Sequence, residues 1–158
     1  MRFLLLCIMS VLISACGFEL RGVAKLPFET MYVEASDTSP VGNDLRRALK
    51  SSNVRLTNST AEAQAVVQLL GETREKIILS LSGGGRVREY QLRMRVSFRV
   101  YGPNNKELLI PTELVLLRDL SYDDTQILAK ESEEALLFRD IQNDAVQQIM
   151  RRVSAVNP

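Results

Sequence analysis

The side chains that could carry acid–base or metal chemistry in this 158-residue sequence are carboxylates in adjacent pairs, since the chain has no histidine. Histidine is the commonest general base and the commonest ligand of transition metals in proteins. Asp123 with Asp124, and Glu133 with Glu134, could act as acid–base or metal-binding pairs. Adjacent acids near a helix start more often cap the helix or interact with its dipole. We therefore expect a protein that is not an enzyme and that holds no metal.

A second stretch that could do chemistry is Gly83-Gly84-Gly85, because glycine-rich loops can cradle phosphates. A phosphate-binding loop continues into Lys and Ser or Thr and opens a helix, and neither feature is present here. The glycines instead separate two segments with strand-like composition. We interpret them as a hairpin turn, because glycine accepts the positive φ that such turns require.

The N-terminus has the pattern of a secretory signal peptide. Arg2 precedes a short apolar run, Phe3 to Ile13, which is too short to span a bilayer. The segment Ile13-Ser14-Ala15-Cys16 resembles the lipobox of bacterial lipoproteins. That resemblance implies cleavage before Cys16 and covalent attachment of a diacylglycerol and an N-acyl chain to this cysteine. The alternative is an ordinary signal peptide with an unrelated cysteine.

The lipobox interpretation also divides the chain and places it in the cell. It predicts a signal peptide at 1–15, a lipidated tether at 16–28 and a single α/β sandwich domain at 29–158. Gly17, where some lipoproteins have Asp, implies export to the outer membrane by the sorting pattern of this class. Several acyl chains anchor a protein firmly, because each buried methylene contributes about 0.8 kcal/mol.

Charge and cysteine content exclude two further features. Lys and Arg number 20 against 19 Asp and Glu, and removal of Arg2 with the signal peptide brings the formal net charge to zero. Nucleic-acid binding depends on clustered positive charge, so we expect no nucleic-acid partner. Cys7 leaves with the signal peptide and Cys16 carries lipid, which leaves no pair for a disulfide. We expect no cofactor besides the acyl chains on Cys16.

The first half of the domain alternates strand-like and helix-like patterns. Residues 30–34 and 54–56 have strand-like composition, and Ser39 followed by Pro40 predicts the start of a helix that runs to Lys50. The segment 65–82 predicts a long strand. Its apolar face is expected to comprise Val67, Leu69, Ile77, Leu79 and Leu81, and its polar face Gln68, Glu72, Arg74, Lys76 and Ser80.

The clearest period-two pattern follows the glycine turn. Apolar side chains at Tyr90, Leu92, Met94, Val96, Phe98 and Val100 alternate with polar ones, which predicts the central strand of the sheet. A turn at 102–105 leads into another extended run, 108–122. Pro111 cannot donate a ladder hydrogen bond, so this run should be an edge strand or carry a bulge.

The C-terminal segment predicts the longest helix, since Phe138, Ile141, Ala145, Ile149 and Val153 recur every three or four residues. The complete order of elements predicts an α+β fold. Two helices should pack on one face of a roughly four-stranded, largely antiparallel (mixed) sheet, and the other face should be left for solvent or a partner.

Three segments resemble the LptE family of outer-membrane lipoproteins, in the order that the family has them. They are Cys16-Gly17-Phe18-Glu19-Leu20-Arg21-Gly22, Glu89-Tyr90-Gln91-Leu92 and Leu128-Ala129-Lys130-Glu131. The resemblance implies a two-helix, four-stranded domain that sits as a plug inside a large β-barrel, LptD, and binds lipopolysaccharide. It also implies that no bond is made or broken.

The resemblance implies lipopolysaccharide contacts for particular basic residues. Lys130 matches the lysine of the family's Leu-Ala-Lys motif. The family also has a basic residue at the hairpin tip, where this chain has glycine, with Arg86 and Arg88 just beyond it. On the residues alone, Lys130 could instead pair with Glu134 one turn along the helix, which would be an exposed contact of about 0.3 to 0.5 kcal/mol.

Arg93, Arg95 and Arg99 form a stripe on the polar face of the central strand. If the domain is a plug, these arginines are candidates for contact with the polar inner wall of a barrel. The alternative is an ordinary solvated face. The function of a generic outer-membrane lipoprotein that serves as an adaptor for another envelope complex also stays open.

Overall fold

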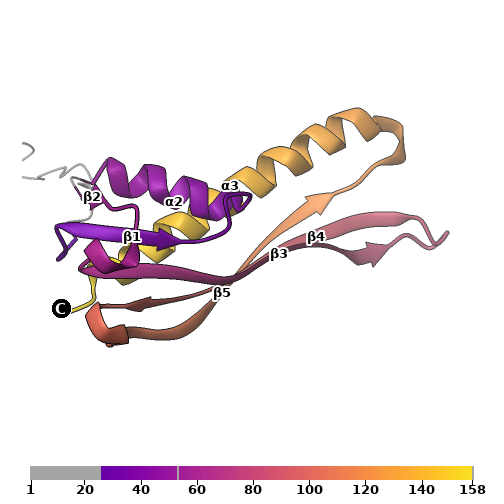
Figure 1. Ribbon diagram of the computed structural model, residues 1–158. Coiled ribbons are helices and arrows are strands. Elements are labelled where there is room, and N and C mark those ends of the chain that lie inside the picture. Colours follow the sequence, from indigo (N-terminus) through magenta and orange to yellow (C-terminus); the bar gives the residue numbers. More distant parts are fainter. Residues whose placement is uncertain (1–25, 53, 158) are drawn as a thin grey trace, which may run out of the picture.

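The computed structural model describes residues 26–52 and 54–157, and Figure 1 shows the order of their elements. The strands are β1 (Thr30–Glu34), β2 (Arg55–Leu56), β3 (Ala65–Leu81), β4 (Val87–Tyr101) and β5 (Glu107–Ser121), and the helices are α2 (Pro40–Lys50) and α3 (Ile127–Ser154). Short 3-10 turns lie at Thr60–Glu62, Pro103–Asn105 and Asp124–Gln126. The signal-peptide prediction and Cys16 lie outside the described residues.

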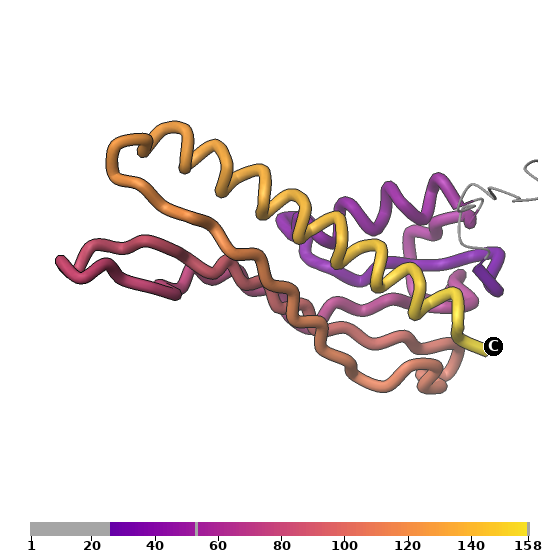
Figure 2. Tube along the Cα trace, turned by 180° about the vertical axis from the view of Figure 1, so that it is seen from behind, coloured from indigo at the N-terminus to yellow at the C-terminus, as the bar shows by residue number. Residues whose placement is uncertain are grey.

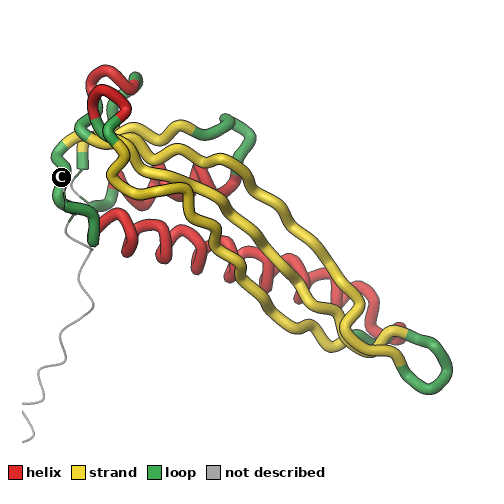
Figure 3. The backbone as a smooth tube through the Cα atoms, turned by 90° about the horizontal axis from the view of Figure 1, so that it is seen from below, coloured by secondary structure: helices red, strands yellow, loops and turns green. Residues whose placement is uncertain are grey.

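The predicted α+β fold is confirmed. One five-stranded sheet has the order β2-β1-β3-β4-β5, and the small difference from about four strands is the two-residue β2. β1 pairs in parallel with β2 and β3, whereas β3, β4 and β5 are antiparallel. Both helices lie on the same face of the sheet (Figures 1 and 3). The opposite face, called the outer face below, has no helix on it.

The start of α2 follows from its sequence. Ser39 is extended and its hydroxyl accepts a hydrogen bond from the Gly42 N–H at 2.9 Å, while Pro40 occupies the first turn, where no donor is needed. Leu45 and Leu49 lie one turn apart and are fully buried. The helix therefore forms as predicted, with one apolar face against the sheet.

β4 supplies the centre of the core. Leu92, Met94, Val96, Phe98 and Val100 are all buried, as the alternation predicted. α3 covers them through Ile141, Ala145, Ile149 and Val153, which are buried as well. The central strand and the long helix were therefore both correctly derived from periodicity.

The predicted faces of β3 are wrong from Glu72 to Ile77, whereas Ser80 lies on the outer face as predicted, opposite Glu89. A β-bulge between Leu69 and Gly71 inserts one extra residue, and after it Glu72, Arg74 and Lys76 pair with the core-facing residues of β4. These charged side chains therefore lie on the helix side of the sheet. Ile77 pairs with Gln91 on the outer face instead of pointing to the core. A one-residue insertion reverses the side chains that follow it, because the period of a strand is two. Here the reversal lasts to Ile78, after which the register shifts again.

β5 is an edge strand and also carries an irregularity, as Pro111 predicted. The register with β4 jumps between Phe98↔Thr112 and Val100↔Leu109, so Pro111 falls in the irregular part. A proline is tolerated there because the strand does not need its missing N–H. The preceding turn uses positive φ at Asn104 and Asn105.

The molecule has two regions, which Figure 2 shows from behind. We call residues 72–96 and 114–139 the arm, and the remaining described residues the base. In the base, β1, β2 and α2 lie beside the long strands, and the C-terminal part of α3 covers them. The arm contains only the extensions of β3, β4 and β5 and the first part of α3, and it projects beyond α2. Within the described ranges, no helix combines the length and apolar composition needed to cross a membrane.

Candidate functional site

The structure places the predicted lipopolysaccharide-contacting residues in the arm. Lys130 lies in the first turn of α3, and Arg86 and Arg88 lie where the β3–β4 turn passes into β4. The turn is the predicted glycine hairpin, in which Gly85 has a φ of 78° and its N–H donates to the Ser82 C=O. The far end of the arm therefore carries basic side chains from two elements.

Lys130 is held by two contacts. Its Nζ donates to Glu133 Oε2 at 2.8 Å and to Ser121 Oγ at 3.0 Å, and its side chain is only 16% exposed. The expected alternative partner, Glu134, is engaged elsewhere. The carboxylate next to the Lys130 ammonium is thus that of Glu133, three residues along the helix, and an incoming anion would compete with it.

Arg88 is close to the position of Lys130. The Tyr122 N–H donates to the Arg88 C=O at 2.7 Å, which joins the end of β5 to the start of β4. A surface depression of about 430 Å³ is lined by Arg88 and by Ser121, the residue that Lys130 contacts. Arg88 therefore lines this depression, and Lys130 contacts it only through Ser121, while Arg86 lies further along the hairpin.

A cluster that the sequence did not reveal holds the arm together behind this depression. Lys76 Nζ lies 2.6 Å from Glu134 Oε2, 4.2 Å from the ring centroid of Tyr90 and 5.8 Å from that of Tyr122. The two tyrosine rings meet edge to face at 5.2 Å. Such contacts stabilise a cation that the bulge has turned toward the helix.

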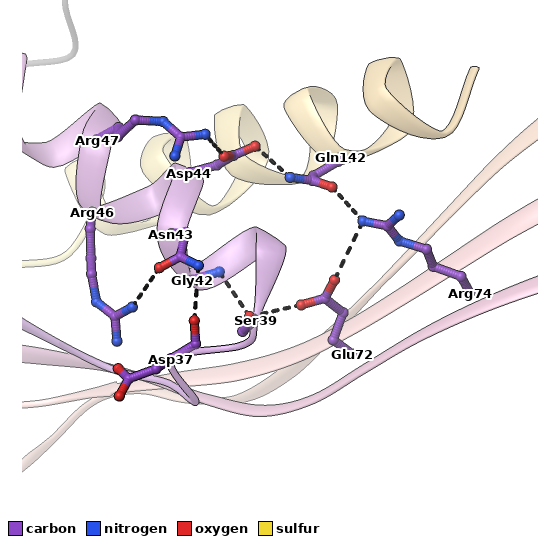
Figure 4. A network of polar contacts seen from close by, with 10 residues as sticks. All are labelled: Asp37, Ser39, Gly42, Asn43, Asp44, Arg46, Arg47, Glu72, Arg74 and Gln142. Atoms are coloured by element: carbon purple, nitrogen blue, oxygen red, sulfur yellow. Dashed lines mark hydrogen bonds and ion pairs between the residues drawn. The ribbon is translucent and has the colours of Figure 1, made fainter. Parts of the chain in front are cut away.

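A polar network joins the arm to the base (Figure 4). Arg74 of the arm donates to the Gln142 side-chain oxygen, and Gln142 in turn donates to Asp44 of α2. Glu72 accepts a hydrogen bond from the N-cap Ser39 hydroxyl at 2.8 Å. The network links α2, β3 and α3 at the point where α2 begins.

The predicted arginine stripe lies on the outer face, but its members differ in their surroundings. Arg93 Nη1 is 3.4 Å from Glu75 Oε2, and Arg99 Nε donates to Gln68 Oε1 at 2.5 Å. The Arg99 guanidinium also lies 4.9 Å from the ring centroid of Tyr101. Arg95 Nε is buried and has no hydrogen-bond partner in the described part of the chain.

The carboxylate pairs have structural roles. The N–H and the hydroxyl of Thr125 donate to Asp123, and these hydrogen bonds lower the pKa of the Asp123 carboxyl. Glu133 and Glu134 each bind a lysine, as described above. Among residues 26–52 and 54–157, no cluster of acidic or cysteine side chains has the geometry of a metal site.

Comparison with known proteins identifies the family of this chain. The family model for LptE, described as lipopolysaccharide-assembly, matches residues 28–153. This chain belongs to the LptE family. LPS-assembly lipoprotein LptE of Pectobacterium atrosepticum is 26% identical over 154 residues, which covers 94% of this chain and 83% of that protein. The protein of the same name from Yersinia enterocolitica is 28% identical over 154 residues, which covers 94% of this chain and 73% of that protein.

Solved structures of lipoproteins share the fold. Lipoprotein B from Nitrosomonas europaea, solved by NMR, superposes with a TM-score of 0.78 at 45% identity, covering 88% of this chain and 91% of that one. The rare lipoprotein B from Shewanella oneidensis gives a TM-score of 0.71 at 28% identity, covering 80% and 94%. Membership in the LptE family confirms that the protein is a lipopolysaccharide-assembly lipoprotein and not an enzyme.

Proposed function

We propose that the protein binds lipopolysaccharide with the end of its arm and assists its assembly at the cell surface as the plug of an LptD-type β-barrel. A lipid on Cys16 would hold it in the outer membrane, with the domain on the periplasmic side or within the barrel. Family membership and the lipobox-like N-terminus support this proposal. The steps that follow are binding and positioning, since no bond changes.

The observation that carries the proposal is the combination of cationic and apolar side chains at the end of the arm. Arg88 and Ser121 line one depression, and Lys130 donates to Ser121. Leu81 and Leu128, in the same end of the arm, are 56% and 80% exposed. Lipid A presents phosphates and acyl chains together. Ammonium and guanidinium groups bind phosphates, and exposed apolar side chains suit acyl chains.

Glu133 makes lipopolysaccharide binding a competition. The Lys130 ammonium is already neutralised by the Glu133 carboxylate, so a phosphate must replace that contact. A partly exposed helical ion pair of this kind contributes only about 0.3 to 1 kcal/mol, whereas a phosphate offers up to about two charges and three acceptor oxygens. The exchange can therefore favour the phosphate.

The outer face supports the plug assignment. Barrel interiors are polar, and a plug must present polar groups to them. Arg93, Arg95 and Arg99 lie there. Arg93 and Arg99 already contact Glu75 and Gln68, whereas Arg95 has a buried Nε without a hydrogen-bond partner among the described residues. We assign Arg95 as the arginine of this stripe with most to gain from a carboxylate of the barrel wall.

Co-purification from detergent-solubilised outer membrane tests the proposal. Recovery of a large β-barrel in about equal amount with the lipidated protein is expected. Cys16→Ala should lose acyl labelling and give an unprocessed or soluble form with an unaffected domain, because the cysteine makes no disulfide. Recovery of another envelope complex, with no barrel, would favour the adaptor function instead.

A further inference from the structure

The β3 edge of the sheet is paired with another strand in the base and unpaired in the arm. β1 covers this edge of β3 only as far as the pair Glu34↔Gln68. β3 then continues to Leu81 with β4 on its other side and no strand of the described chain on this one. The edge of β3 beyond Gly71 is therefore free along the whole arm.

The register identifies which backbone groups point out of this edge. The Tyr122 N–H donates to the Arg88 C=O, and β4 stays in continuous register with β5 from Glu89↔Ser121 to Phe98↔Thr112. In an antiparallel pair, every second residue is hydrogen-bonded to the partner strand. The backbone N–H and C=O groups of even-numbered β4 residues therefore point to β5, and those of odd-numbered residues point to β3.

The odd-numbered β4 residues are paired with Gly71, Thr73, Glu75 and Ile77 of β3. The backbone N–H and C=O groups of these four residues therefore bond to β4. Those of the even-numbered residues Glu72, Arg74, Lys76 and Ile78 point to the free edge. A row of alternating donors and acceptors of this kind is a template for another strand.

The side chains around this edge also lack cover. Leu70, Ile78, Leu79 and Leu81 are between 49% and 56% exposed. On the helix side, an open groove of about 620 Å³ runs between β3 and α3 and is lined by Arg74, Lys76, Glu131, Glu134, Ala135, Phe138 and Arg139. In the base, β1 and α2 fill the corresponding flank of the same sheet.

We infer that an extended segment of the barrel partner adds to the β3 edge of the arm as a further strand, paired with Glu72, Arg74, Lys76 and Ile78. This inference rests on the proposed function, which supplies the partner. The segment continues the position of β1 and carries apolar side chains toward Ile78. The segment is a loop or a terminus of the partner and not a strand of its closed wall, because the strands of a closed wall have both edges paired.

The other edge of the sheet is a less suitable site for a strand. β5 has an irregular register at Pro111, and a proline and a bulge are two devices that discourage strand addition. β3 has no proline, and its register with β4 is regular from Gly71 to Ile78, because the bulge at Leu69 and Gly71 lies before this stretch and the shifts between Ile78 and Leu81 lie after it. Strand addition is therefore expected at β3 and not at β5.

Residue-resolved hydrogen exchange on the wild-type protein, alone and with the co-purified barrel, tests the inference. The amides of Thr73, Glu75 and Ile77 should exchange slowly in both samples, since β4 already binds them. The amides of Glu72, Arg74 and Lys76 should exchange fast alone and slowly in the complex. Capture of the barrel with unchanged exchange at these three amides would overturn the strand and leave the proposed function intact.

A matched pair of variants gives a second test. Ile78→Pro removes one outward N–H, and Ile78→Ala removes the same side chain but keeps that donor. Losing one backbone hydrogen bond predicts about three- to ten-fold weaker barrel capture by the proline variant than by the alanine variant. Equal capture by both folded variants would overturn the inference. If the proline variant does not fold, the exchange data decide, and a wild type that captures no barrel overturns both proposals.

Discussion

The base and the arm share three strands and one helix, yet they are held together differently. In the base, Leu45, Phe98 and Ile149 are fully buried between the sheet and two helices. In the arm, α3 alone covers the sheet. Leu92, Met94 and Leu116 are still buried beneath it, but further toward the end of the arm the contacts include those of Lys76 with Glu134 and with the Tyr90 ring. Large apolar side chains are exposed there, Leu128 by 80%.

This difference between the base and the arm bears on the stability of the protein. Burial of apolar side chains supplies most of the free energy of folding, so the base and the part of the arm next to it should determine the global stability. Partly exposed ion pairs contribute little, so the end of the arm should open at lower cost than the core. This chain thus combines a stable base with an arm whose end is held more weakly.

The largest effect is expected from the core of the base. Phe98→Ala should lower the free energy of unfolding by about 3 to 5 kcal/mol, because the ring is completely buried. Arg95→Ala on the outer face should cost well under about 1 kcal/mol in the isolated domain. Denaturant titration measures both, and equal losses would mean that the two faces of β4 are assigned wrongly.

A smaller and more local effect is expected in the arm. Lys76→Met keeps an unbranched side chain but removes the ion pair with Glu134 and the contact with Tyr90. Global stability should fall by about 1 kcal/mol. Hydrogen exchange should accelerate at residues 74–92 and stay unchanged around Val67 in the base. Uniform acceleration over both regions would contradict their separation.

The smallest effect is a change in pH dependence. Desolvation and the hydrogen bond that the Tyr101 hydroxyl donates to Glu34, at 2.9 Å, raise the pKa of Tyr101 above its ordinary value of 10.0. The folded state therefore holds this proton more tightly than the unfolded state. The contribution of this group to the free energy of unfolding is present in full below the ordinary pKa, and it is lost as the pH rises through the raised pKa. Thermal midpoints should fall more steeply above pH 10 for wild type than for Tyr101→Phe. If the midpoints of both proteins fall in parallel with pH, the Tyr101 hydroxyl does not contribute to stability in this way.

The fold could be predicted from the sequence because its strongest patterns are periodic. The alternation from Tyr90 to Val100 and the spacing from Phe138 to Val153 each fix a face, and packing confirms both. Pro111 and Ser39 gave correct local predictions for the same reason, since each has a backbone preference that does not depend on distant residues.

The arm was harder to predict because one bulge reverses β3. Leu69 and Leu70 are consecutive apolar residues followed by Gly71, and this break in alternation was the available indication. The contacts of Lys76 with Tyr90 and Glu134 depend on that reversal. The pairing of Lys130 with Glu133, and not Glu134, depends on side-chain rotamers and on Ser121, which spacing along a helix cannot specify.

The most direct measurement is lipopolysaccharide capture by wild type, Lys130→Asp and Glu133→Gln, compared at matched circular dichroism. Lys106→Asp is the matched control, because it makes the same change at an exposed lysine in the base. We expect a steep loss for Lys130→Asp, a gain for Glu133→Gln because it removes the competing carboxylate, and no change for Lys106→Asp. Capture by wild type should weaken as salt screens the phosphate contact. Equal capture by wild type and Lys130→Asp would contradict lipopolysaccharide binding at the end of the arm.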